Sequence, residues 1–125
     1  MKLHLHHSEG NVINACDDDS ISVNGERHEK SLIISSALLI LDWSPTRVDE
    51  IDAEHLREVA KFCEIGDVVI LGTGVSSPLP NPEWQAPFAA LNVPLEVMSL
   101  RAACRTYNIL CGDGRKVIAA LLLGG

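Results

Sequence analysis

Residues 98–110 carry the side chains of this sequence that are best suited to chemistry. Arg101 and Arg105 are four residues apart, so in a helix they share a face and can bind a carboxylate or phosphate group. Cys104 lies between them, and nearby arginines and a helix N-terminus lower the pKa of a thiol. The segment therefore raises two hypotheses, an anion site and a reactive cysteine.

A glycine-bracketed turn would face the start of this helix. Ser99 is a good N-cap, and the free N–H groups of the first turn favour an anion. We predict a ligand cleft between this helix and the turn, lined by Gly72, Thr73, Gly74, Ser99, Arg101 and Arg105. The turn is too short for a dinucleotide fingerprint or a phosphate loop. The alternative is that the arginines pair with the protein's own carboxylates and that the glycines only turn the chain.

The same helix also has a packing interpretation. Leu100, Ala103, Cys104 and Tyr107 form an apolar stripe, which indicates a buried and unreactive thiol. We expect Tyr107 and Asn108 to tie the helix to the loop that follows residue 72, because a surface loop needs hydrogen-bond partners.

No catalytic residue, metal site or cofactor is predicted. A cysteine nucleophile needs a histidine, and no sequence rule brings His28 or His55 to the helix. His4, His6 and His7 lack a carboxylate or cysteine at ligand spacing. Residues 17–19 are three aspartates without the glycine and glutamate of a calcium loop. The sequence leans away from an enzyme and leaves the question open.

Composition limits the class of protein. The 125 residues fit one domain, residues 1–125, which can bury a core without disulfides. A formal charge of -7 repels a phosphate backbone, which argues against nucleic acid as a partner. The apolar stretches are too short for membrane insertion, and the start does not resemble a signal peptide. Four cysteines without a Cys-x-x-Cys pair are expected to be reduced thiols, and the predicted location is the cytoplasm.

The elements that must position these residues follow a mixed pattern. Asn24-Gly25 predicts a tight hairpin whose return strand runs from about residue 26 toward 34, and Asp52 predicts the cap of an amphipathic helix. The apolar run 68–71 predicts a strand covered on both faces, in the middle of the sheet. Further elements are expected as strands at 12–15, 31–35, 38–41, 94–98 and 117–123, and as helices at 83–91 and 99–110. The result is an α/β fold whose second half alternates strand and helix.

Several of these segments together resemble a known family. They are the hairpin at 23–25, the turn at 72–74, the strand at 95–98, the helix at 102–108 and the exit at 114–115. The sequence resembles a domain-of-unknown-function family of bacterial, archaeal and mitochondrial proteins that includes mitochondrial respiratory complex I assembly factor 3. The resemblance implies a single three-layer domain with a mixed central β-sheet, helices packed on it and an N-terminal β-hairpin. The family commonly has an aromatic residue where His28 stands, and often a small hydroxyl residue where Leu100 stands.

Three classes of function follow. The first is a non-catalytic interaction or assembly factor with a protein partner, linked by the resemblance to respiratory complex assembly. Its predicted partner surface is an exposed apolar patch around Trp84 and Phe88, near the proline-rich loop. The second is a small anionic-ligand binding protein or enzyme that uses the cleft defined above. The third is a homo-oligomer whose site forms only between subunits.

Overall fold

A mixed six-stranded sheet forms the centre of the molecule. The computed structural model describes residues 2–5, 10–74 and 80–124. Across the sheet the strands are ordered β1 (Lys2–Leu5), β6 (Leu38–Leu41), β5 (Leu32–Ser35), β9 (Val117–Leu121), β7 (Val68–Gly72) and β8 (Leu95–Met98).

Strand β9 joins the two halves of this sheet. It pairs antiparallel with β5, so that Ile33 lies opposite Ala120, and parallel with β7, so that Val69 lies beside Ile118. Strands β1, β6 and β5 thus form an antiparallel half, and β7, β8 and β9 form a parallel half. The α/β prediction with a mixed sheet is confirmed.

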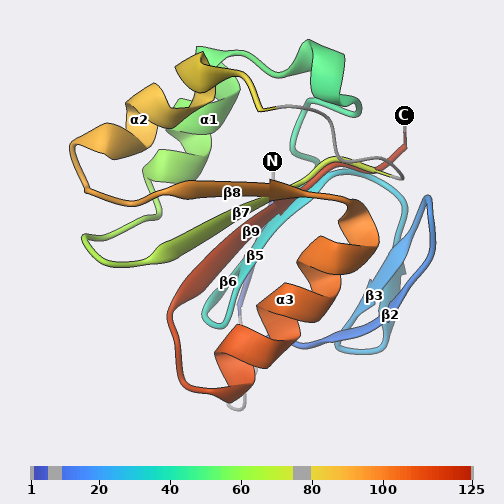
Figure 1. The fold of residues 1–125 in the computed structure, drawn as a ribbon. Coiled ribbons are helices and arrows are strands. Elements are labelled where there is room, and N and C mark those ends of the chain that lie inside the picture. The colour runs from blue at the N-terminus through green and yellow to red at the C-terminus, as the bar shows by residue number, and fades with distance from the viewer. Residues whose placement is uncertain (1, 6–9, 75–79, 125) are drawn as a thin grey trace.

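Helices cover both faces of the sheet, which gives three layers (Figure 1). One face carries α1 (Ala53–Ala60), the 3-10 helix η2 (Pro82–Gln85) and α2 (Ala86–Ala89). The other face carries α3 (Leu100–Gly112), and a small three-stranded sheet lies beside it in the same layer. That second sheet consists of β2 (Ile13–Cys16), β3 (Ile21–Val23) and β4 (Glu26–His28).

The hairpin between β3 and β4 forms as the sequence predicts. Asn24 and Gly25 have φ angles of 53° and 85°, the left-handed values that a type I′ turn requires. The predicted return strand toward residue 34 is wrong, because β4 ends at His28 and β5 begins at Leu32 in the other sheet. Between them, the Ser31 hydroxyl donates to the Leu123 carbonyl at 3.1 Å and anchors the crossing to the main sheet.

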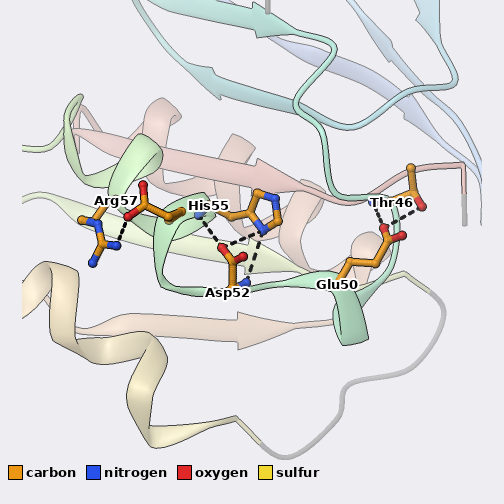
Figure 2. A network of polar contacts seen from close by, with 6 residues as sticks. Thr46, Glu50, Asp52, His55 and Arg57 are labelled. Carbon is orange, nitrogen blue, oxygen red and sulfur yellow. Dashed lines mark hydrogen bonds and ion pairs between the residues drawn. The ribbon is translucent and has the colours of Figure 1, made fainter.

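Polar side chains shape the connection into α1, as Figure 2 shows. The Asp52 carboxylate accepts from the His55 amide at 3.0 Å, and the Asp52 amide donates to His55 Nδ1 at 3.2 Å. The Glu50 carboxylate accepts from the amide and hydroxyl of Thr46 at 2.7 and 3.0 Å, and from the Arg47 amide at 3.2 Å. These bonds lower the pKa of Glu50, and those of Asp52 confirm it as the helix cap.

Each face of the sheet contributes to a separate core. Alternate residues of β9 point to opposite sides, so Ala119 packs beneath α3 and Ile118 packs beneath α1 and α2. The predicted burial of residues 68–71 is confirmed for 69–71, which are fully buried, whereas Val68 is only partly buried. Their strand, β7, is paired on both sides but lies next to the edge strand β8, not in the middle of the sheet.

Candidate functional site

The turn and the helix start that would line the predicted cleft are hydrogen-bonded to each other. The Leu100 amide donates to the Gly74 carbonyl at 2.7 Å, and the Ala102 amide donates to the Ser99 hydroxyl at 3.3 Å. The Thr73 amide donates to the Met98 carbonyl at 2.9 Å. The structure therefore brings the turn and the cap together as predicted, and these bonds occupy the Leu100 and Ala102 amides of the first turn. Residues 75–79 lie outside the described part.

Gly72 allows this close approach. A Cβ atom at this position would lie 2.9 Å from Leu121 Cδ2 and 3.0 Å from the Cβ of Ala103. The absence of a side chain thus lets α3 pack directly on the end of β7. The role of Gly72 in the structure is packing between helix and sheet.

The two arginines lie on another side of α3, facing β2. Arg101 donates through Nε to Asp18 at 3.1 Å and through Nη1 to the Cys16 carbonyl at 3.1 Å. The hydrogen bond and the negative charge of Asp18 raise the pKa of the Arg101 guanidinium. Arg105 is exposed, and no carboxylate of the described residues forms an ion pair with it. One of the two predicted anion ligands is therefore engaged in an internal ion pair.

A groove of about 330 Å³ lies between the two elements, and we call it the β2–α3 groove. Its walls come from β2 and from one face of α3. The lining residues are Ile13, Asn14, Ala15, Cys16, Arg101, Cys104, Arg105 and Asn108.

Tyr107 and Asn108 fix the N-terminal segment to α3. The Tyr107 hydroxyl donates to the Asn11 carbonyl at 2.8 Å, and the Asn108 carboxamide donates to the Ile13 carbonyl at 2.7 Å. The predicted tie to the loop after residue 72 is wrong, because both side chains bond to residues more than ninety positions away. Nothing in the local pattern around Tyr107 indicates so distant a partner.

The cysteines are free thiols. Cys104 is only 3% exposed, and burial raises the pKa of its thiol, which confirms the prediction of a buried residue. Burial also raises the pKa of Cys63 to about 12. Both groups remain protonated at neutral pH, so neither acts as a thiolate nucleophile in this conformation.

A second groove, which the sequence reasoning missed, lies between α3 and the β8 edge of the sheet. It has a volume of about 460 Å³, and we call it the β8 groove. Apolar side chains form its walls, and Asp67, Glu96 and Arg115 contribute charges. The other lining residues are Gly66, Val68, Ile70, Asn92, Pro94, Met98, Thr106 and Leu110.

The layer arrangement explains why this groove is open. Six strands span roughly 24 Å between the outermost axes, whereas a single helix is only about 10 Å wide. In Figure 1 the small sheet lies on one side of α3, and β8 emerges on the other side. Glu96 alternates with Leu95 and Val97, a period-two pattern that could have indicated a strand with one open face.

Asp67 lies at the end of the β8 groove near the start of β7. It is 6% exposed, and its Oδ2 accepts from the Glu64 amide at 2.8 Å. Burial raises the pKa of this carboxyl group. A cationic group bound in the groove would therefore favour its ionised form.

The predicted partner surface at Trp84 and Phe88 does not form. Trp84 is 8% exposed and Phe88 is fully buried, and both pack with α1 in the core on that face of the sheet. The amphipathic pattern of the short helices explains the difference, since their aromatic residues face the sheet and leave alanines outside. No exposed aromatic patch is available at these two positions.

The histidines do not assemble a metal site in the described residues, where no group of three or more His, Cys, Asp or Glu side chains is suitably placed. His6 and His7 lie outside that part. On β4, His28 lies opposite Ile21 of β3. Its Nε2 is buried and has no hydrogen-bond partner among the described residues. Across the same residues, no helix has the length and apolar character needed to span a membrane.

Solved structures with the same arrangement come from several bacteria. A Bordetella parapertussis protein is 33% identical, with a TM-score of 0.86, over 94% of this chain and 98% of its own. A Bordetella pertussis Mth938-like domain is 30% identical, with a TM-score of 0.76, over 100% of this chain and 94% of its own. A Bartonella henselae protein described as an outer membrane protein is 25% identical, with a TM-score of 0.70, over 94% of this chain and 98% of its own.

No curated protein matches this sequence. A family model matches residues 13–122, from the first residue of β2 to the residue after β9. The matched range includes both grooves completely, since every residue that lines them lies within it. The chain therefore belongs to the family described as protein of unknown function DUF498/DUF598.

Proposed function

We propose that this protein is a non-catalytic interaction domain that binds an extended segment of a partner protein at the β8 edge. The observation that carries the proposal is an apolar groove beside a sheet edge that no other strand of the described residues pairs with. Such an edge presents backbone N–H and C=O groups to an added strand.

The hydrogen bonds around β8 identify the groups that face this edge. The Met98 carbonyl accepts from the Thr73 amide, so the backbone N–H and C=O groups of Met98 point toward β7. Because these groups alternate in direction from one residue to the next along a strand, the backbone groups of Leu95 and Val97 point toward the free edge. The Leu95 amide already donates to Gln85 Oε1 at 2.9 Å, and this side chain takes the place of a neighbouring strand. The N–H and C=O groups of Val97 are the next ones along the edge, and no strand in the described part of the chain pairs with them.

Charge and shape define the partner. Glu96 is exposed and Asp67 lies at the end of the groove, in a protein whose formal charge is -7. A segment that places an apolar side chain between Met98 and Leu110, with a lysine or arginine next to it, complements both features. The partner is therefore an extended peptide segment that is apolar and basic.

Charge reversal at the groove tests the proposal. We expect a Glu96→Arg variant to capture about tenfold less cross-linked partner from native cells than the wild type, because it repels the basic segment. Glu26→Arg is the matched control, since Glu26 is also an exposed strand residue but lies on β4. Binding should also slow hydrogen exchange at the Val97 amide.

Two results would contradict this function. One is equal capture of the partner by the Glu96→Arg and Glu26→Arg variants. The other is a wild-type protein whose β8 edge is protected only by a second copy of itself, which light scattering would detect as a dimer.

By resemblance, we extend the proposal to assembly of a respiratory complex, with the cytoplasm as the site of action. The mitochondrial member of the resembling family supports this role, and the predicted interaction surface is compatible with it. Deletion of the gene should lower the amount of assembled complex on native gels, and a Glu96→Arg copy should restore it less well than a Glu26→Arg copy. Full restoration by Glu96→Arg would separate the role from the β8 groove.

A further inference from the structure

Two polar clamps hold β2 against α3 on either side of Cys104. At one end, Asn108 bonds to both backbone groups of Ile13, at 2.7 and 3.2 Å. At the other end, Arg101 bonds to the Cys16 carbonyl at 3.1 Å. Three strand steps and seven helix steps both span roughly 10 Å, so the two elements run side by side between the clamps.

This arrangement brings two thiols together. Cys104 lies three residues after Arg101 and four before Asn108, and helix side chains lean toward the N-terminus, which here is the end nearer Cys16. Both cysteines line the β2–α3 groove and pack in the same cluster. The Cys16 thiol also lies near enough to contribute, after burial, to the raised pKa of Cys104.

We propose that Cys16 and Cys104 are an oxidation site, at which a peroxide converts the two thiols into a disulfide that joins β2 to α3. The proposal rests on the paired clamps and on the position of both sulfur atoms in one groove. It is independent of the β8 groove, which lies on the other side of α3.

The exposure of the two residues determines which thiol reacts first. Cys16 is half-buried and is reached from solvent, whereas Cys104 lies behind it. The Cys16 sulfur attacks one peroxide oxygen, the O–O bond breaks, and a sulfenic acid forms with release of water. The Cys104 thiol then passes its proton to the sulfenic oxygen as its sulfur attacks the Cys16 sulfur, so that no free Cys104 thiolate is needed; the S–O bond breaks, and the oxygen leaves as water. Two thiols are oxidised by two electrons, and one peroxide is reduced to two waters.

The remaining cysteines provide internal controls. Cys63 lies in the core on the opposite face of the sheet, and Cys111 is in contact with Tyr107 two turns further along α3. Neither residue lines the β2–α3 groove. A Cys111→Ser variant is the matched control, because Cys111 is also a half-buried thiol.

The test treats the folded wild-type protein with hydrogen peroxide and maps its peptides under denaturing, non-reducing conditions. We expect an intramolecular Cys16–Cys104 peptide and a mass loss of about 2 Da for the intact chain. Oxidation should raise the melting temperature by on the order of 10 °C, because the disulfide closes a long loop of the unfolded chain.

Variants separate this site from general oxidation. Cys111→Ser should form the same disulfide, whereas Cys104→Ser should stop at the sulfenic acid of Cys16, with a gain of about 16 Da. A wild-type map in which Cys16 and Cys104 stay unlinked while other thiols react would overturn the proposal. Disulfides formed only between two molecules would also overturn it, and the wild-type map requires no variant to fold.

Discussion

The side chain of Asn108 replaces a strand partner for Ile13, donating to its carbonyl at 2.7 Å and accepting from its amide at 3.2 Å. One carboxamide thus satisfies both backbone groups of the first residue in β2. We expect Asn108→Ala to lower the free energy of unfolding by about 2 kcal/mol, because it leaves two partly buried groups without partners. Urea denaturation measures the change. Ile109→Ala, at a position that is 58% exposed, should change it by less than about 0.5 kcal/mol; equal effects of the two substitutions would contradict this role of Asn108.

Asn11 is a second connection between the small and the main sheet. It is 2% exposed, its Nδ2 donates to the Ser35 carbonyl at 2.9 Å and to the Leu38 carbonyl at 3.0 Å, and its carbonyl accepts from Tyr107. Asn11→Ala should destabilise the protein by about 3 kcal/mol, more than Tyr107→Phe at about 1–2 kcal/mol, because it removes several buried bonds. Thermal unfolding of both variants would rank them, and the reverse order would contradict the role of Asn11.

Close packing at Gly72 predicts that alanine substitution there changes the stability of the fold in the opposite direction from alanine substitution at Gly112. Gly72→Ala should destabilise the fold by about 1–3 kcal/mol, because its Cβ would lie 2.9 Å from Leu121 Cδ2. Gly112→Ala should be neutral or stabilising by up to about 1 kcal/mol, because nothing lies within 4 Å and alanine favours the helix. Denaturant midpoints of the two variants give the comparison, and a tolerated Gly72→Ala would show that α3 can move away from β7.

The Glu50 carboxylate makes stability depend on pH in acid. Its pKa is lower in the folded than in the unfolded protein, so its contribution is present above the unfolded pKa of about 4.3 and is lost as pH falls through the folded value. Glu50→Gln should therefore have a lower urea midpoint than the wild type at pH 7, with a smaller difference below pH 4. Asp49→Asn is the control, and a difference that stays constant with pH would exclude the carboxylate as the cause.

Buried thiols should make the protein less stable in alkali. The pKa of Cys63 is about 12 in the folded protein and roughly 8.5 when unfolded, so stability is full below pH 8.5 and falls as pH rises toward 12. A Cys63→Ala variant should lose less stability than the wild type between pH 8 and 10.

Under native conditions the half-buried Cys16 should react with a thiol reagent before Cys63, as peptide mapping after brief labelling would show.

Local patterns predict most of the helices and strands. Asp52 and Ser99 cap their helices as expected, and Asn24-Gly25 adopts the positive φ angles of the predicted turn. These features depend on interactions within a few residues, which short-range sequence rules describe. The return strand after Gly25 is mispredicted because the apolar pattern of β5 continues that of β4 without showing that the chain changes sheets.

The candidate sites depend on contacts that are distant in sequence. The sequence suggests that Arg101 is available to a ligand, but Asp18 lies beside it only because β2 packs on α3. Trp84 and Phe88 follow a proline-rich loop that suggested exposure, whereas burial against α1 decides their environment. The β8 groove arises from the order of strands across the sheet, which no single segment encodes.

Strand order also constrains how the chain can fold during synthesis. The last strand, β9, lies between β5 and β7, so the antiparallel and parallel halves have no shared hydrogen bonds until it is in place. A ribosome-bound chain that still lacks residues 117–121 therefore exposes the inner edges of two separate half-sheets. Completion of the main sheet therefore requires residues 117–121, and any chaperone that protects those edges must release them to β9.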